Sequence, residues 1–176
     1  DPIRQEAFPV INSLKRAGIS KVVMMTGDSE RTARAVAAQI GVDEYYSEVL
    51  PEDKAGYVER EKAAGRKVIM IGDGINDSPA LSAADVGIAI SDGAEIAREI
   101  ADVTIGADNL YEIVTLKAIS NGLMKRIHKN YRSIILINAG LIALGVTGII
   151  QPTTSALLHN TSTLVIGLKS MQNLID

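Results

Sequence analysis

Two segments of this chain end an apolar run in a cluster of glycine, acidic and small polar residues. The first is VVMMTGD, residues 22–28, and the second is VIMIGDGIND, residues 68–77. Glycines let backbone N–H groups approach a phosphate closely, and carboxylates are the hard oxygen ligands that magnesium prefers. These residue types, at this spacing, indicate a site for magnesium and a phosphoryl group.

The first segment and a lysine between the two runs supply candidate phosphate contacts. The hydroxyl of Thr26 and the backbone at Gly27 can contact phosphate oxygens, and Asp28 adds a carboxylate beside them. Lys54, in the segment PEDK between the two runs, can neutralise phosphate charge. Phosphoryl transfer needs mainly positioning and charge neutralisation, which such a set supplies. The alternatives are that Asp28 caps a helix and that Lys54 is a solvated surface lysine.

The second segment carries the candidate metal ligands. Asp73 and Asp77 are the candidate magnesium ligands, and Asn76 can hydrogen-bond the phosphoryl group without adding negative charge. The alternative is that Asp77 only caps a following helix. Because one helix cap does not require two aspartates, an asparagine and two glycines, the segment GDGIND favours the chemical interpretation.

For this chemistry the two runs must end at one edge of a sheet, and the pattern around them predicts that arrangement. Apolar β-branched runs alternate with helical patterns bounded by glycine or proline, which predicts a parallel α/β sheet with helices on both faces. In such sheets the functional groups gather at the carboxyl ends of the strands. The expected helices are residues 3–18, 30–40, 51–65, 77–84 and 93–101, and the expected strands are residues 19–28, 44–50, 67–74, 85–90 and 102–105.

Composition excludes several classes of function. A net charge of −3 over 176 residues gives no reason to expect a nucleic-acid partner. The chain contains no cysteine, so it has no disulfides and no thiolate metal sites. Its start, DPIRQEAF, is charged from the first residue and has no signal-peptide character, which suggests that the chain begins inside a longer protein.

The last third of the chain has a different composition. A long helix is expected from residue 109, ending in a basic stretch with Lys125, Arg126, Lys129 and Arg132. Residues 133–150 then carry no charge, and a second, weaker apolar segment covers residues 156–168. We expect two membrane spans with both ends cytoplasmic and the turn at residues 151–155 outside. The alternative is a buried helical hairpin in a larger soluble core.

The motifs resemble those of a known family. The segments MMTGD, PEDK and MIGDGINDSPAL stand in the order and approximate spacing of the cation-pumping P-type ATPases, which belong to the haloacid-dehalogenase-like phosphotransferases. The segment GDGINDSPALSAADVGIAI is similar to the heavy-metal branch, which also places two final membrane spans after this domain. The segment DPIRQEA resembles the point where the family's chain returns from its nucleotide-binding domain. The resemblance covers essentially all of the chain.

This resemblance implies a fold and a function. The implied fold is a Rossmann-like, haloacid-dehalogenase-like α/β domain, incomplete here, over residues 1–108. A basic linking helix over residues 109–132 and an all-α transmembrane helical hairpin over residues 133–176 follow. The implied function is an ATP-driven heavy-metal cation pump that works through an aspartyl-phosphate, with Mg²⁺ as cofactor. The implied partners are the lipid bilayer, the transported metal and the remainder of the pump, in a multi-pass protein, with a cell membrane as the expected location and this domain cytoplasmic.

By the same motifs, Thr26, Gly27 and Asp28 contact the phosphoryl group, Lys54 stabilises it, Asp73 binds magnesium, and Asn76 and Asp77 complete the site. Asp1 and Arg4 match the hinge motif that the family uses near ATP. The chain departs from the family in one decisive respect: the family's nucleophile is the aspartate of DKTGT, and no such segment occurs here. The nucleotide-binding and actuator domains and the earlier spans are also missing, so we expect the isolated chain to be inactive.

A polar residue inside a membrane span is costly and therefore suggests a function. In heavy-metal pumps the last span carries a metal-ligand position, and the corresponding residue here is His159, with Asn138 of the preceding span facing the same region. A neutral imidazole suits a divalent metal such as zinc or cobalt better than copper(I), and manganese and cadmium remain open. The alternative for His159 is an interfacial histidine or one that only bonds a neighbouring helix.

Two other functional classes compete with the pump. A soluble phosphatase of the haloacid-dehalogenase group shares the GDGxND strand end, but it needs no membrane span and does need an N-terminal DxDx nucleophile. A non-catalytic, membrane-anchored module that binds phosphate or magnesium fits the missing catalytic parts of the isolated chain. The nucleophile segment upstream in the reading frame would distinguish a pump from both.

Overall fold

The computed structural model describes residues 3–72, 75–90, 99–106 and 109–174. The chain divides into two compact units, residues 1–115 and residues 116–176. The first is an α/β unit and the second is a pair of helices, so each is described by itself.

The strands of the α/β unit are short and all pair in parallel. Strand β1 (Val23–Met25) pairs with β2 (Glu44–Tyr46), and β4 (Val86–Ile90) lies between β3 (Ile69–Gly72) and β5 (Val103–Ile105). The parallel arrangement predicted from the alternating pattern is therefore confirmed.

The prediction of one continuous sheet is not met within the described residues. The strands form a two-stranded ladder, β1-β2, and a separate three-stranded ladder, β3-β4-β5. Each of β1 and β3 therefore has one edge without a strand partner in the described part of the chain. The two ladders still share a core, because Met25 of β1 packs against the buried cluster that contains Met70 of β3.

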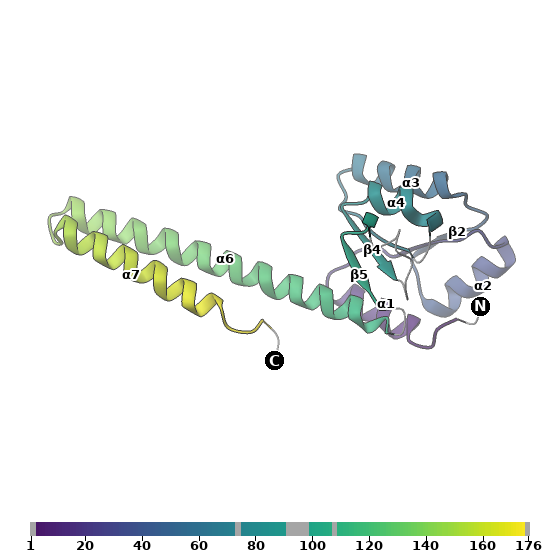
Figure 1. The fold of residues 1–176 in the computed structure, drawn as a ribbon, viewed down its shortest axis with the longest axis horizontal. Coiled ribbons are helices and arrows are strands. Elements are labelled where there is room, and N and C mark those ends of the chain that lie inside the picture. Colours follow the sequence, from purple (N-terminus) through teal and green to yellow (C-terminus); the bar gives the residue numbers. More distant parts are fainter. Residues whose placement is uncertain (1–2, 73–74, 91–98, 107–108, 175–176) are drawn as a thin grey trace. The chain divides into compact units, whose positions relative to one another are not determined.

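The helices of this unit are α1 (Ala7–Arg16), α2 (Glu30–Ile40), α3 (Pro51–Ala63) and α4 (Ser78–Ala83), with a 3₁₀ turn, η1, at Ile75–Asp77. Helices α3 and α4 lie together on one side of the strands, and α1 and α2 lie on the other (Figure 1). Helices on both faces were predicted for this pattern.

Helix boundaries follow local chemistry. Helix α2 ends at Gly41, which has a φ of 76°, a left-handed conformation that glycine adopts without strain. Helix α1 begins at Ala7, four residues later than predicted, because Pro9 has no N–H to donate to the carbonyl of Gln5. The helix predicted for residues 93–101 lies mostly outside the described residues.

The centre of the α/β unit is a small apolar cluster. Val58 of α3, Met70 of β3, and Ala80 and Leu81 of α4 are all buried. Helix α4 packs tightly on β4, since a Cβ at Gly87 would stand only 2.8 Å from the carbonyl oxygen of Leu81. This core holds the carboxyl end of β3 and the start of α4 in place.

The second unit is a helical hairpin. Helix α6 (Tyr111–Val146) is one continuous helix that begins in the first unit, and α7 (Pro152–Ser170) returns beside it, antiparallel (Figure 1). The turn includes Gly148, with a φ of 73°, and ends before Pro152, the first residue of α7. The turn therefore comes a few residues earlier than the predicted residues 151–155.

The hairpin is apolar over much of its surface, and large exposed side chains include Leu136, Ile142, Val146 and Leu164. None of the described helices is both long enough and apolar enough to cross a membrane. The charge-free run 133–150 is divided between the end of α6 and the turn that follows it. The transmembrane hairpin expected from the sequence therefore stays a prediction.

Candidate functional site

The end of β1 folds into a tight polar turn. The Thr26 hydroxyl donates to Asp28 Oδ2 at 2.9 Å and accepts from the Asp28 backbone N–H at 3.1 Å. Both carboxylate and hydroxyl lie at the carboxyl end of the strand, where the sequence predicted them. A Cβ at Gly27 would meet no atom closer than 3.9 Å, so within this chain the turn itself does not require glycine.

The turn is anchored by the segment that follows β2. The backbone N–H groups of Glu48 and Val49 donate to the carbonyls of Asp28 and Thr26, both at 3.0 Å. Glu30, the first residue of α2, accepts from the hydroxyl of Ser47 at 2.8 Å. This hydrogen bond is the main cause that holds the pKa of Glu30 below its usual range. The shape of the TGD turn thus depends on contacts about 20 residues further along the chain.

At the end of β3, Asp77 forms an ion pair with Lys54 of α3. The Lys54 ammonium donates to Asp77 Oδ1 at 2.7 Å, and the two side chains are 16% and 11% exposed. Asp77 precedes α4 but makes no side-chain capping hydrogen bond to it. The alternative in which Asp77 serves only as a helix cap is therefore wrong, and Lys54 is not a solvated surface lysine.

Gly72 creates the space that Asp77 occupies. A Cβ at Gly72 would stand 2.6 Å from the Cβ of Asp77 and 2.7 Å from its Oδ2. Contacts this close are not tolerated in proteins, so any side chain at this position would displace the carboxylate. The last residue of β3 must be glycine because of this close approach.

The start of helix α3 positions Lys54 beside Asp77. Pro51 occupies the first helical position, where its missing N–H costs nothing, and Asp53 Oδ2 accepts the backbone N–H of Leu50 at 3.3 Å. Lys54 follows in the first turn, on the face that packs on α4 and η1. The segment PEDK therefore combines a helix start with a buried cation.

Other predicted site residues are placed less fully. Asn76 lies in η1 and is exposed, and Arg4 precedes α1. Asp73 and Asp1 lie outside the described residues. Among the described residues no three acidic or histidine side chains gather as a metal site, so the predicted magnesium site is not assembled from them alone.

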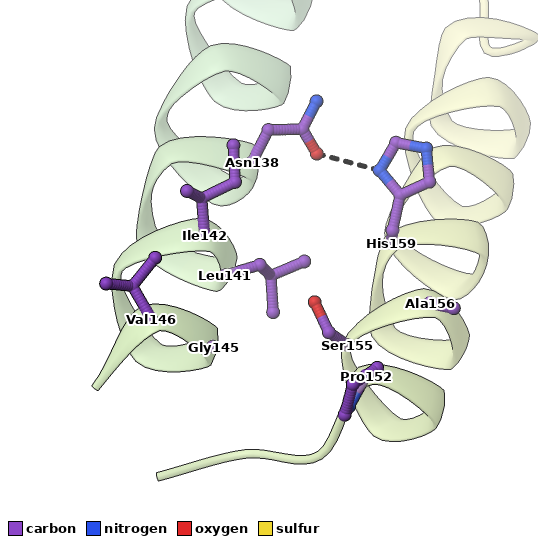
Figure 2. A pocket seen from close by; sticks show the side chains of 9 residues that line it. All are labelled: Asn138, Leu141, Ile142, Gly145, Val146, Pro152, Ser155, Ala156 and His159. Atoms are coloured by element: carbon purple, nitrogen blue, oxygen red, sulfur yellow. Dashed lines mark hydrogen bonds between the residues drawn. The ribbon is translucent and has the colours of Figure 1, made fainter. Parts of the chain in front are cut away.

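In the hairpin, His159 of α7 faces Asn138 of α6. His159 Nδ1 and Asn138 Oδ1 are 2.7 Å apart at one end of an open groove of about 600 Å³ (Figure 2). The hydroxyls of Ser162 and Thr163 donate to the carbonyl of His159, at 2.8 and 3.0 Å. Those hydroxyls are engaged with their own helix, and the polar side chains that line the groove are Asn138, Ser155 and His159 (Figure 2).

The sequence interpretation missed several residues that shape these sites. Gly72 was noted as a glycine near phosphate, whereas its structural role is to admit Asp77. Glu30 and Ser47 gave no signal, because their contact joins α2 to the segment after β2. Arg126 was treated only as part of a basic cluster, although it hydrogen-bonds three backbone carbonyls beyond α7 and at its end.

The sequence model of the haloacid dehalogenase-like hydrolases matches residues 1–85. Among curated proteins, the chain is 39% identical over 167 residues to the manganese-exporting P-type ATPase of Mycobacterium leprae, covering 94% of this chain and 23% of that protein. The zinc-exporting P-type ATPase of Mycobacterium marinum shows the same identity and coverage. The probable copper-importing P-type ATPase A of Enterococcus hirae is 42% identical over 154 residues, covering 86% of this chain and 21% of that protein.

Solved structures agree with these relatives. A crystal structure of a zinc-transporting PIB-type ATPase in the E2P state matches all of this chain and 28% of its own, with a TM-score of 0.80 and 30% identity. The catalytic domain of a CPx-ATPase matches 65% of this chain and 45% of its own, with a TM-score of 0.59 and 34% identity. The chain spans about a quarter of the length of the curated relatives that it matches.

Proposed function

Because this chain belongs to the heavy-metal P-type ATPases, whose catalytic unit is haloacid dehalogenase-like, we propose that it forms part of an ATP-driven pump for a metal cation. The observation that carries the proposal is the Lys54–Asp77 ion pair at the end of β3. The two opposite charges are largely buried, and Asp77 makes no capping hydrogen bond to α4. The pair lies at the carboxyl ends of the strands, where α/β proteins bind ligands.

The described residues divide the work of phosphoryl transfer. Gly27 presents a backbone N–H to phosphoryl oxygens. The Thr26 hydroxyl, which donates its one proton to Asp28 at 2.9 Å, would turn from Asp28 to a phosphoryl oxygen when the group is bound. Lys54 offsets the negative charge of the phosphoryl group, and Asp77 holds the ammonium in place. Such fixed charges stabilise a transition state because they do not have to reorient during the reaction.

Magnesium fits this site only in part through the described residues. Asp77 Oδ1 is paired with Lys54, and the pair has no net charge, so it does not attract a cation by itself. We assign the main ligand to Asp73, with Asp77 Oδ2 in support, since carboxylates and phosphate oxygens are the ligands that magnesium prefers. When bound, the ion would offset charge on the transferred phosphoryl group.

The remainder of the pump supplies what this chain lacks. The sequence contains no DKTGT segment, so the aspartate that accepts the phosphoryl group from ATP must come from another part of the parent protein. The edges of β1 and β3 that have no strand partner within the described residues support a related proposal, that a strand from that part joins the two ladders. We expect the isolated chain to form no aspartyl-phosphate. Arg4 and Asp1 are proposed to lie near the nucleotide.

We propose that the α6–α7 hairpin is the membrane part of the chain. The support is the charge-free run 133–150, the exposed apolar side chains of both helices, and the basic residues at 125–132 that precede the run. Positive charges beside an apolar segment favour the cytoplasmic side, which would place the α/β unit in the cytoplasm. The partner implied for the hairpin is the lipid bilayer.

We propose that His159 binds the transported ion through Nε2. Because Asn138 Oδ1 can only accept, His159 Nδ1 donates to it, and this leaves the lone pair on Nε2. Asn138 then orients the histidine rather than binding the metal itself, as hydrogen-bonded partners of metal-bound histidines commonly do. A neutral imidazole suits zinc, cobalt, cadmium or manganese, and the relatives described above are named as transporters of manganese, zinc and copper.

The test is ATP hydrolysis by the full-length pump that contains this chain, in lipid, with each of these metals in turn. We expect metal-stimulated turnover that is lost in Asp73→Asn and in Lys54→Met. His159→Ala should change the metal profile, and the matched control is His128→Ala, the other histidine of the chain.

Two outcomes would overturn the proposal. If no metal stimulates turnover, the assignment of the chain to a metal pump is wrong. If Lys54→Met keeps full turnover, the ion pair has no role in phosphoryl transfer. If the protein then bound magnesium and phosphate without turnover, it would be a non-catalytic binding module.

A further inference from the structure

One arginine of α6 binds the end of α7. The Arg126 guanidinium donates through Nη1 to the carbonyls of Ser170 and Gln172, and through Nη2 to the carbonyl of Asn173 at 2.7 Å. The last carbonyls of a helix have no partner within the helix, and a cation at that end is also favoured by the helix dipole. Arg126 therefore caps α7 from the neighbouring helix.

A second contact lies one turn further along α6. The side-chain amide of Asn130 donates to the hydroxyl of Ser170 at 2.6 Å, and that hydroxyl donates to the carbonyl of Ile166 at 2.8 Å. Arg126 and Asn130 are four residues apart, so both face α7 from the same side of α6. Together these contacts form a polar latch, which we define as Arg126, Asn130 and Ser170.

The latch and the His159–Asn138 pair require the same helix register. Asn138 lies twelve residues after Arg126 on α6, and His159 lies eleven residues before Ser170 on α7. At about 1.5 Å per residue these spacings are about 18 Å and about 16 Å, so the latch and the pair are satisfied together. A slip of one helical turn, about 5.4 Å, would break both.

Apolar contacts between α6 and α7 do not determine that register well. Burial of apolar surface is non-directional, and several of the side chains along the hairpin are still exposed. Hydrogen bonds to backbone carbonyls, by contrast, are lost when one helix slides along the other. The three carbonyls bound by Arg126 are the strongest such constraint among the described residues of the hairpin.

We propose that Arg126 is a positioning residue that sets the α6–α7 register and thereby holds His159 against Asn138, with Nε2 free for the ion. The proposal deepens the proposed function, on which its ion-binding part rests. Arginine suits the task because its planar fork reaches several acceptors at once, whereas lysine offers a single point charge.

The first test measures register directly in the chain, which contains no cysteine. In one variant Leu141→Cys is combined with Ser155→Cys, because the side chains of these two residues point toward each other across the groove (Figure 2). In a second, Ser155→Cys is combined with Gly145→Cys, one turn further along α6, where a Cβ meets no atom within 4 Å. In the wild-type background we expect the first disulfide to form at least ten times as readily as the second. Arg126→Ala should reduce this ratio several-fold. Arg126→Lys should be intermediate.

The control is Lys125→Ala, which removes an exposed, neighbouring positive charge and should leave the preference unchanged. If Arg126→Ala leaves the ratio of the two disulfides at its wild-type value, the proposal is wrong. The same holds if Lys125→Ala changes the ratio as much, since net charge rather than the latch would then be responsible.

The second test measures which tautomer His159 adopts. Nitrogen NMR of the chain's two histidines distinguishes the Nδ1–H from the Nε2–H tautomer, and we expect Arg126→Ala to lower the Nδ1–H population of His159 but not of His128. A population that stays at its wild-type value would overturn the positioning role. Neither test uses ATP hydrolysis, so failure of the pump assay and failure of this proposal are separate results.

Discussion

The two ends of the parallel strands use their aspartates differently. At the amino ends, one aspartate stands directly before each second strand of a pair and accepts a backbone N–H at the start of the neighbouring strand, from the residue just before that strand or from one within it. The three contacts are Asp43 with Val22 at 2.7 Å, Asp85 with Val68 at 2.9 Å, and Asp102 with Gly87 at 2.8 Å. Every parallel pair among the described strands thus has one such contact, which ties the two strands in register.

At the carboxyl ends, the described aspartates bond side chains close to the expected phosphoryl site. Asp77 pairs with Lys54, and Asp28 pairs with the hydroxyl of Thr26. Contacts to a backbone N–H are tied to the pairing of the strands, whereas the Thr26 hydroxyl can turn toward a ligand and the Lys54 ammonium has further protons to donate to one. Aspartates at the amino ends therefore hold the strands together, and those at the carboxyl ends are left for chemistry.

Breaking the Lys54–Asp77 pair should have the largest effect. Removing one partner leaves the other charge buried, so we expect Lys54→Met or Asp77→Leu to lower the free energy of unfolding by about 3 kcal/mol. Urea unfolding followed by circular dichroism would measure it, and the double variant should cost less than the two single variants added together. Purely additive losses would mean that the two groups do not interact.

Two glycines at the carboxyl ends should differ in their effect on stability. Gly72→Ala should destabilise the chain by about 2 kcal/mol, because its Cβ would overlap Asp77. Gly27→Ala has open space around its Cβ and should fold normally. In the full-length pump, loss of turnover in Gly27→Ala without loss of stability would show that this glycine serves ligand approach. Equal stability of the two variants would contradict the packing argument for Gly72.

At the amino ends of the strands, a substitution should lower stability without changing turnover. Asp85→Asn weakens the contact with the Val68 N–H and removes the charge paired with Lys67, so thermal unfolding should shift to slightly lower temperature. The turnover number of the full-length pump should stay at its wild-type value, since the residue lies at the other end of the strand. A large fall in turnover with unchanged stability would refute the division of labour between the two ends.

The smallest expected effect is on the dependence of stability on pH. The backbone hydrogen bond from Val68 is the main cause that lowers the pKa of Asp85, and the hydrogen bond from Lys15 is the main cause for Asp43. A depressed folded-state pKa contributes stability above the unfolded value of about 3.9, and this stability is lost as pH falls below it. Urea midpoints at pH 7 and pH 3 should therefore differ more in the wild type than in Asp85→Asn. Equal differences would indicate that this carboxylate is not linked to folding.

Much of the α/β unit could be predicted from the sequence because its signals are local. The glycine and proline boundaries of α2 and α3 and the apolar runs of β3 and β4 depend on neighbouring residues only. The motif GDGIND also led to Asp77 as a site residue. Its partner was foreseen only as a general phosphate contact, because the distance between Lys54 and Asp77 depends on how α3 packs on η1 and α4.

Periodicity and motifs along the chain were enough to predict most of the described helices and strands, their parallel pairing and the family. Folded contacts were needed to show that Gly72 must admit Asp77, that the described strands form two ladders, and that Arg126 reaches the end of α7. The physical reason is that hydrogen bonds and close contacts between distant residues depend on distances that no local pattern encodes. The residues that make these contacts have no distinctive sequence context, and their roles follow only from the contacts.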